Sequence, residues 1–108
     1  MNFREITPAD LHEKLSSGQQ LQLIDVREPE EFAICKLPES KLIPLGEIPK
    51  RYSEIDPEAE VIVICHHGFR SAQAIQFLSQ RFGFTNLINL KGGIHAWAEQ
   101  VDPEMSVY

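Results

Sequence analysis

The chain has 108 residues, is 43% hydrophobic and carries a formal net charge of -6 at pH 7. A chain of this size and composition can bury a core without disulfides, so we expect a single domain over residues 1–108. The acidic balance argues against nucleic acid and membrane surfaces as partners, because both bind clusters of Lys and Arg.

The apolar pattern predicts strands and helices in alternation. In chain order these are a strand at residues 3–6, a helix over 7–18, a strand at 21–26, a short helix opening at 27–32, a strand at 41–45 and a helical stretch at 46–55. A buried strand at 61–64, a helix over 71–82, a last strand at 86–90 and an amphipathic helix over 94–101 complete the series. The helix over 71–82 is expected to bury Ala74, Ile75, Leu78 and Phe82. This alternation predicts an α/β fold with a mainly parallel sheet and helices on both faces.

The sequence also bears on where the protein works. No apolar run approaches the roughly 20 residues that a membrane-spanning helix needs, and the first residues lack the features of a secretory signal. We therefore expect a cytoplasmic protein, in which Cys35 and Cys65 remain free thiols. Cys35 has no basic neighbour before Lys36, and we interpret it as a packing residue.

Cys65 is the candidate nucleophile. It follows four β-branched residues at 61–64 and precedes a predicted helix, and sites in parallel sheets lie beyond the carboxyl ends of the strands. The N–H groups of the turn and the positive end of the helix dipole would favour a thiolate there. Asp25 and Arg27 end the strand at 21–26, so the same rule places them on the rim that holds Cys65. We interpret them first as an ion pair that holds the strand end and second as substrate contacts.

The residues after Cys65 have the composition of an anion site. Gly68 permits a tight loop whose N–H groups converge on the sulfur. Arg70, and His66 or His67 when protonated, would add positive potential that attracts an anion such as thiosulfate. The two histidines are not expected to hold a metal, because adjacent ligands on one tight loop rarely close a tetrahedral site and no other Cys or His cluster accompanies them in the sequence.

Three motifs, in this order along the chain, resemble the rhodanese, or sulfurtransferase, superfamily. Residues 25–28 (DVRE) are similar to its Asp-Val-Arg motif, residues 65–70 (CHHGFR) to its six-residue active-site loop and residues 91–97 (KGGIHAW) to its C-terminal signature. The resemblance implies a rhodanese-like fold with a five-stranded parallel sheet and no metal or organic cofactor. It also implies a reaction in which Cys65 takes sulfane sulfur from a donor such as thiosulfate and passes it as a persulfide to a thiophilic acceptor.

The same motifs give the candidate site and partners. We expect Cys65 to be catalytic, Asp25 and Arg27 to support the site, and the substrate to be bound by His66, His67, Gly68, Phe69, Arg70 and the hydroxyl of Ser71. Residues 101–108 look like the end of rhodanese domains appended to adenylyltransferases that activate ubiquitin-like sulfur carriers. The resemblance therefore implies an adenylyltransferase, such a sulfur carrier or a cysteine desulfurase as a partner.

Two alternative functions remain open. The first is a non-catalytic rhodanese-fold module that docks partners through the loop and Phe69, although a loop aromatic could equally fold back onto the core. The second is a Cys-dependent dual-specificity phosphatase. Related phosphatases place an arginine six residues after the cysteine, whereas this chain has Arg70 and then Ser71. The tighter loop favours a persulfide sulfur over a phosphoryl group.

Overall fold

The computed structural model describes residues 3–108, and their framework is one sheet of five strands in which all neighbours run parallel. The strands are β1 (Arg4–Ile6), β2 (Leu21–Asp25), β3 (Lys41–Leu42), β4 (Glu60–Ile64) and β5 (Leu87–Leu90). Their order across the sheet is β1-β5-β4-β2-β3. The expected α/β fold with a parallel sheet is confirmed.

β4 is the central strand, paired with β2 on one side and β5 on the other. Its four β-branched residues are each at most 1% exposed, because helices cover both faces of the sheet. Val61 and Val63 point into one core cluster, which Cys65 joins. Ile62 and Ile64 point into the cluster on the opposite face. The alternation of side chains along β4 thus sends the Cys65 side chain to a defined face of the sheet.

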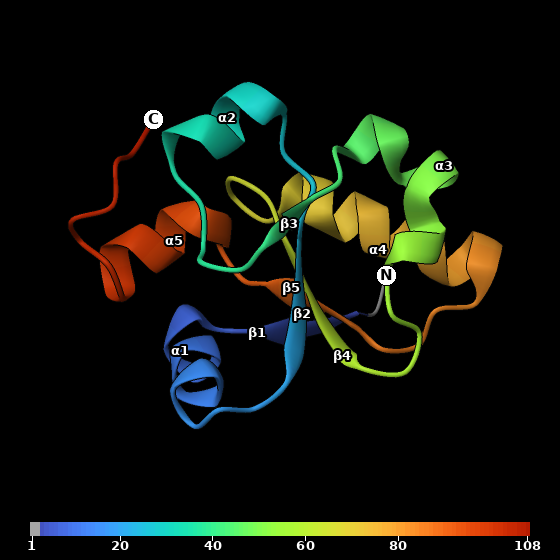
Figure 1. Cartoon of the computed structure of the whole chain (residues 1–108), viewed down its shortest axis with the longest axis horizontal. Coiled ribbons are helices and arrows are strands. Elements are labelled where there is room, and N and C mark those ends of the chain that lie inside the picture. Colours follow the sequence, from blue (N-terminus) through green and yellow to red (C-terminus); the bar gives the residue numbers. More distant parts are fainter. Residues whose placement is uncertain (1–2) are drawn as a thin grey trace.

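Two pairs of helices form the outer layers (Figure 1). α1 (Pro8–Ser16) and α5 (Gly93–Gln100) pack against one face through Leu11, Ile94 and Trp97. α3 (Ile48–Arg51) and α4 (Phe69–Phe82) cover the other face through Ile48 and the buried side of α4. α2 (Pro29–Ile34) follows the carboxyl end of β2. It therefore lies at the edge of the sheet where the site residues are expected.

The 46–55 stretch differs from the prediction of one helix. It forms a 3₁₀ turn η1 (Leu45–Glu47), the single helical turn α3 and a second 3₁₀ turn η2 (Tyr52–Glu54). Pro49 lies in the first turn of α3, where its missing N–H is tolerated, and it prevents a longer helix from running through that position. The strand predicted at 41–45 likewise shortens to β3, because Pro44 cannot donate to a ladder.

α4 ends at Phe82 as predicted, but it differs from the prediction in its first residue and in the burial of its last. It begins at Phe69 rather than near residue 71, because Gly68 takes the position before the helix with φ +101°. Ala74, Ile75 and Leu78 are buried as expected, but the burial predicted for Phe82 is wrong. Phe82 is 38% exposed and stacks on Tyr52, with ring centroids 3.8 Å apart. The helix has turned out of the core by its last residue.

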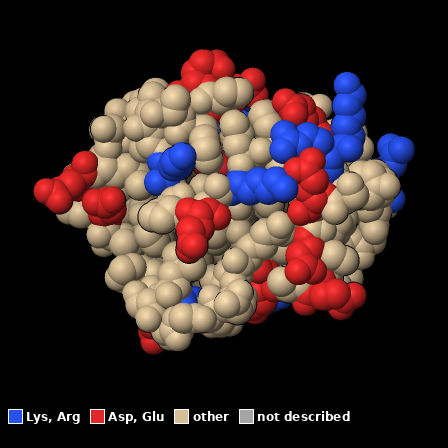
Figure 2. Space-filling view, in the orientation of Figure 1, with Lys and Arg blue, Asp and Glu red and all other residues tan. Residues whose placement is uncertain are grey.

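Charged side chains are mixed on the face shown in Figure 2, where Lys and Arg gather on one side beside Asp and Glu. Near α3, Arg51 pairs with Glu47 and Glu54, and Lys41 pairs with Glu54. These positive charges are therefore partly neutralised locally. Within residues 3–108, no helix has the length and the apolar character needed to cross a membrane.

Candidate active site

Cys65 is the first residue after β4, and its side chain is 1% exposed. The N–H of Gly68 donates to Cys65 Sγ over 3.0 Å, and Ser71 Oγ lies 3.3 Å from the same sulfur. The left-handed backbone of Gly68, which a residue with a Cβ adopts only with strain, gives the loop the turn that aims this N–H at the sulfur. The sulfur thus lies in a polar cradle at the amino end of α4.

Asn89 is a site residue that the sequence analysis missed. It lies on β5, is 2% exposed, and its Oδ1 accepts a hydrogen bond from Ser71 Oγ over 2.5 Å. Its Nδ2 donates to the carbonyl of Gly68 over 3.2 Å. Because Ser71 has a single hydroxyl proton, it donates either to Asn89 or to Cys65 Sγ. The sequence signal that could have identified Asn89 is a single amide side chain in an otherwise apolar strand.

The amino end of α5 holds the other side of the Cys65 loop. The N–H of Ile94 donates to the carbonyl of Cys65 over 2.8 Å, and the N–H of His95 donates to that of His66 over 3.0 Å. Gly93 has φ +66°, and a Cβ there would collide with these same two carbonyl oxygens. Only glycine therefore lets α5 approach the loop so closely.

Arg70 lies in the first turn of α4, and its guanidinium binds Glu31 of α2. The two nitrogens of Arg70 donate to the two carboxylate oxygens over 2.6 and 2.9 Å. This bidentate pairing with Arg70 lowers the pKa of Glu31 to about 2. Among residues 3–108, no hydrogen bond joins Arg70 to Cys65. The negative charge of Glu31 therefore offsets part of the positive potential that was expected from Arg70 near Cys65.

Asp25 and Arg27 form an ion pair on the same rim, and both side chains are fully buried. Nε and Nη2 of Arg27 donate to the Asp25 carboxylate over 2.7 to 3.0 Å. Arg27 also donates to the carbonyl of Cys35 over 2.6 Å and to Tyr108 Oη over 2.9 Å. The pair thereby joins the end of β2 to the end of α2 and to Tyr108. Burial raises the pKa of the Tyr108 hydroxyl to about 12, so this group stays protonated at neutral pH.

Three histidines gather beside this rim. The ring of His66 is sandwiched between His67 and Tyr108, with centroids 4.1 and 4.0 Å away. His95 of α5 lies 6.0 Å from His66 and 4.9 Å from His67, again between ring centroids. Burial, and then the neighbouring His67, lower the pKa of His66. No metal was expected from the two histidines that are adjacent in the sequence, and the fold places a third, His95, beside them.

The remaining predicted residue, Phe69, opens α4 and is 79% exposed. The sequence left open whether Phe69 is exposed or folds back onto the core. In the structure it is exposed. Cys35 is half-buried, and Arg27 Nη1 lies 3.8 Å from its sulfur. This cationic neighbour was not visible from the local sequence, which shows only Lys36.

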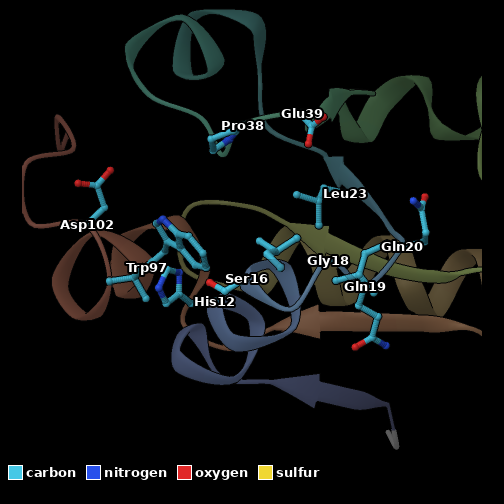
Figure 3. Close-up of a pocket in the computed structure, with 13 residues that line it drawn as sticks. His12, Ser16, Gly18, Gln19, Gln20, Leu23, Pro38, Glu39, Trp97 and Asp102 are labelled. Carbon is cyan, nitrogen blue, oxygen red and sulfur yellow. The ribbon is translucent and has the colours of Figure 1, made fainter.

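A groove of about 720 Å³ lies away from these residues (Figure 3). Trp97 and His12 form one part of its wall, and Glu39 and Asp102 lie at its rim. None of the predicted site residues lines it. We therefore assign the candidate site to the Cys65 loop rather than to this larger groove.

Comparison with known proteins gives a family and several relatives. Residues 7–100 match the model of the family described as "Rhodanese-like domain". A sulfurtransferase of Allochromatium vinosum is 38% identical over 94 residues, and the match covers 87% of this chain and 87% of that protein. Adenylyltransferase and sulfurtransferase MOCS3 of Drosophila yakuba is 41% identical over 106 residues, a match that covers 92% of this chain and 23% of MOCS3.

A solved structure has the same architecture along most of the chain. The rhodanese-related protein of Thermoplasma volcanium matches with a TM-score of 0.81 and 36% sequence identity, covering 92% of this chain and 94% of that one. The chain is thus about as long as some of its relatives and spans about a quarter of MOCS3.

Proposed function

This chain belongs to the rhodanese-like domain family, whose members include sulfurtransferases, and we propose that it transfers sulfane sulfur through a persulfide on Cys65. The observation that carries the proposal is the environment of Cys65 Sγ, which has the Gly68 N–H at 3.0 Å and the Ser71 hydroxyl at 3.3 Å. The Gly68 N–H and the amino end of the 14-residue helix α4 favour an anionic sulfur at this position, and Ser71 adds a second donor when its proton turns from Asn89 to the sulfur.

The proposed reaction has two displacement steps. The Cys65 thiolate attacks the outer sulfur of thiosulfate, a new S–S bond forms, and the electron pair of the broken S–S bond leaves with sulfite. A thiophilic acceptor, such as cyanide or a protein thiolate, then attacks the terminal sulfur of the persulfide. The electron pair of that S–S bond returns to Cys65 as the thiolate. Cyanide would leave as thiocyanate.

The loop supports both forms of the cysteine. Gly68 and Ser71 can donate to the thiolate, and the same donors can serve the persulfide, whose charge lies on the outer sulfur. We assign the predicted substrate-binding role to residues 66–71 and the supporting role to Asp25 and Arg27. Arg70 would contribute to anion binding through the part of its positive charge that Glu31 does not neutralise.

The physiological partners form a further part of this proposal. MOCS3 combines an adenylyltransferase and a sulfurtransferase in one protein, and our chain matches about a quarter of its length. A cysteine desulfurase as donor, and an adenylyltransferase or a ubiquitin-like sulfur carrier on the acceptor side, are consistent with that likeness. We also propose a cytoplasmic location, where a reducing environment would keep Cys65 available as a free thiol.

Intact mass before and after thiosulfate tests the proposal. Wild-type protein should gain one sulfur, roughly 32 Da, because the persulfide is covalent, and cyanide should remove it. Cys35→Ala, the matched control with the other thiol removed, should gain the same mass, whereas Cys65→Ala should gain none. An adduct that survives on Cys65→Ala would refute the assignment.

An interaction module without catalysis is the second candidate, favoured by the 79% exposure of Phe69 beside the loop. The same experiment separates the two functions when a persulfidated cysteine desulfurase replaces thiosulfate as the donor. A wild-type chain that takes sulfur from neither donor would favour the module. Transfer from the desulfurase alone would keep the catalytic proposal and change the donor.

A further inference from the structure

We propose that His66, His67 and His95 form a binding site for a divalent transition-metal ion, with Zn²⁺ as the representative ion. One ring nitrogen from each of the three side chains lies within 4.8 Å of one ring nitrogen of each of the other two. They come from two elements, the Cys65 loop and α5, which are far apart in the sequence. Three imidazoles converging in this way are a donor set that Zn²⁺, Cu²⁺ and Ni²⁺ prefer.

The backbone fixes the two elements before any ion arrives. The N–H of His95 donates to the carbonyl of His66 over 3.0 Å, and Gly93 lets the start of α5 lie against that carbonyl. His66 is held further by the Tyr108 ring, which stacks on it with centroids 4.0 Å apart. The site is therefore partly preorganised, which lowers the ordering cost of binding.

The remaining adjustment is small. Zn–N bonds are about 2.0–2.1 Å long, so nitrogens at the corners of a tetrahedral site lie about 3.3 Å apart. Starting from separations of at most 4.8 Å, the nitrogens must approach by no more than about 1.5 Å. His67 is exposed, and it leaves its stacked position on His66 when it rotates to turn a ring nitrogen towards the two half-buried partners. Three protein ligands leave a fourth position open for water or another ligand.

The carboxylate of Glu99 lies near His95, one of the three proposed ligands. Glu99 Oε2 lies 3.6 Å from His95 Nε2, one helical turn along α5. Metal-binding histidines usually donate their second ring N–H to a carboxylate, which fixes the ring and raises its basicity. An ion on Nδ1 of His95 would leave Nε2–H for Glu99. The present 3.6 Å separation is longer than a hydrogen bond, so Glu99 would move closer when the ion binds.

The site has a consequence for the reaction at Cys65, and this consequence alone rests on the proposed function. An ion held by the loop histidines would bring two positive charges to the segment that follows Cys65. Its open position could also take a sulfur anion such as thiosulfate. Occupancy would then change the rate of sulfur transfer, whereas binding of the ion itself does not require that reaction.

Titration of the purified chain with Co²⁺ and Zn²⁺ tests the site without an activity assay. Wild-type protein should bind one Co²⁺ with the visible absorption of a four-coordinate ion, and Zn²⁺ should displace it. His95→Ala should weaken Zn²⁺ binding, measured by calorimetry, by at least about 10-fold, since even second-shell losses cost 10-fold or more. Equal affinity in wild type and His95→Ala would overturn the proposal.

Two controls make the result specific. His12→Ala removes the fourth histidine, which packs edge-on against Trp97 with ring centroids 6.1 Å apart, and should leave Zn²⁺ binding unchanged. Cys65→Ala should also keep the site, because its three ligands remain. If Cys65→Ala lost the ion while His95→Ala kept it, the ligand would be the thiol and the histidine site would be refuted. Far-ultraviolet circular dichroism of each variant checks that the chain is folded.

Discussion

At the scale of single residues, Arg27 connects three parts of the site. It is fully buried, and its guanidinium binds the Asp25 carboxylate, the Cys35 carbonyl and Tyr108 Oη. A buried charge is costly unless it is paired and hydrogen-bonded. Each of these contacts therefore constrains where the end of α2 and the Tyr108 ring can lie relative to β2.

Arg27→Leu should lower the free energy of unfolding by about 3–5 kcal/mol, because Asp25 would be left as an unpaired buried charge. Arg4→Ala is the matched control, since Arg4 pairs with Glu60 at 3.4 Å and its side chain is 58% exposed. That change should cost less than about 1 kcal/mol. Urea denaturation of both variants measures the difference, and equal losses would contradict the role given to Arg27.

Sequence reasoning reached some of these residues and missed others for a physical reason. Asp25, Arg27 and Cys65 were placed on one rim because each ends a strand of a parallel sheet. Tyr108 gave no such signal, since its contact with Arg27 joins residues 81 positions apart. The same holds for Glu31, whose pairing with Arg70 is created only by the approach of two helices.

At the scale of elements, the seating of α5 on the Cys65 loop shapes the site. The predictions for strands held where β-branched runs are long, as in β4. The predictions of element bounds were least accurate where a proline limits the length of an element. An example is Pro49, at which the predicted helical stretch at 46–55 is divided. The motif at residues 91–97 was recognised from the sequence, but the contact of Gly93 with the loop carbonyls was not, because it depends on tertiary approach.

Gly93→Ala should destabilise the protein by more than about 1 kcal/mol, because the left-handed backbone alone costs an L-residue about 1–2 kcal/mol and the Cβ also collides with the loop. It should slow persulfide formation on Cys65 as well. Gly46→Ala is the control, since an added Cβ there meets nothing within 4 Å. Thermal unfolding and the rate of the mass gain report the two effects, and a Gly93→Ala protein equal to Gly46→Ala in both would contradict this account.

At the scale of the whole molecule, acid stability depends on ion pairs between elements. The pair of Glu31 with Arg70 links α2 to α4, and it holds the pKa of Glu31 at about 2, below the ordinary value of 4.5. The folded state thus binds this proton more weakly than the unfolded state does. The stabilisation is fully present above about pH 4.5 and is lost as the pH falls towards 2.

Glu31→Gln should therefore be less stable than wild type at pH 7, and the difference should shrink as the pH falls from about 4.5 towards 2. Glutamine keeps the oxygen that accepts from the Glu28 N–H, so the start of α2 is preserved. Glu30→Gln is the control, because Glu30 forms no ion pair within residues 3–108. Urea denaturation at stepped pH gives the comparison. A difference that stayed constant with pH would show that the charge of Glu31 is not the cause.

Trp97 is the chain's one tryptophan, and it lies on α5, the helix whose first N–H groups hold the carbonyls of Cys65 and His66. Trp97 is 5% exposed, so we expect its fluorescence to change when α5 loosens and water reaches the ring. The carbonyl of Cys65 accepts from the N–H of Ile94, which lies one helical turn before Trp97 on α5. The molecule thus contains an intrinsic optical reporter, and a change in Trp97 emission on addition of thiosulfate is the expected sign, without an added dye, of the persulfide proposed on Cys65.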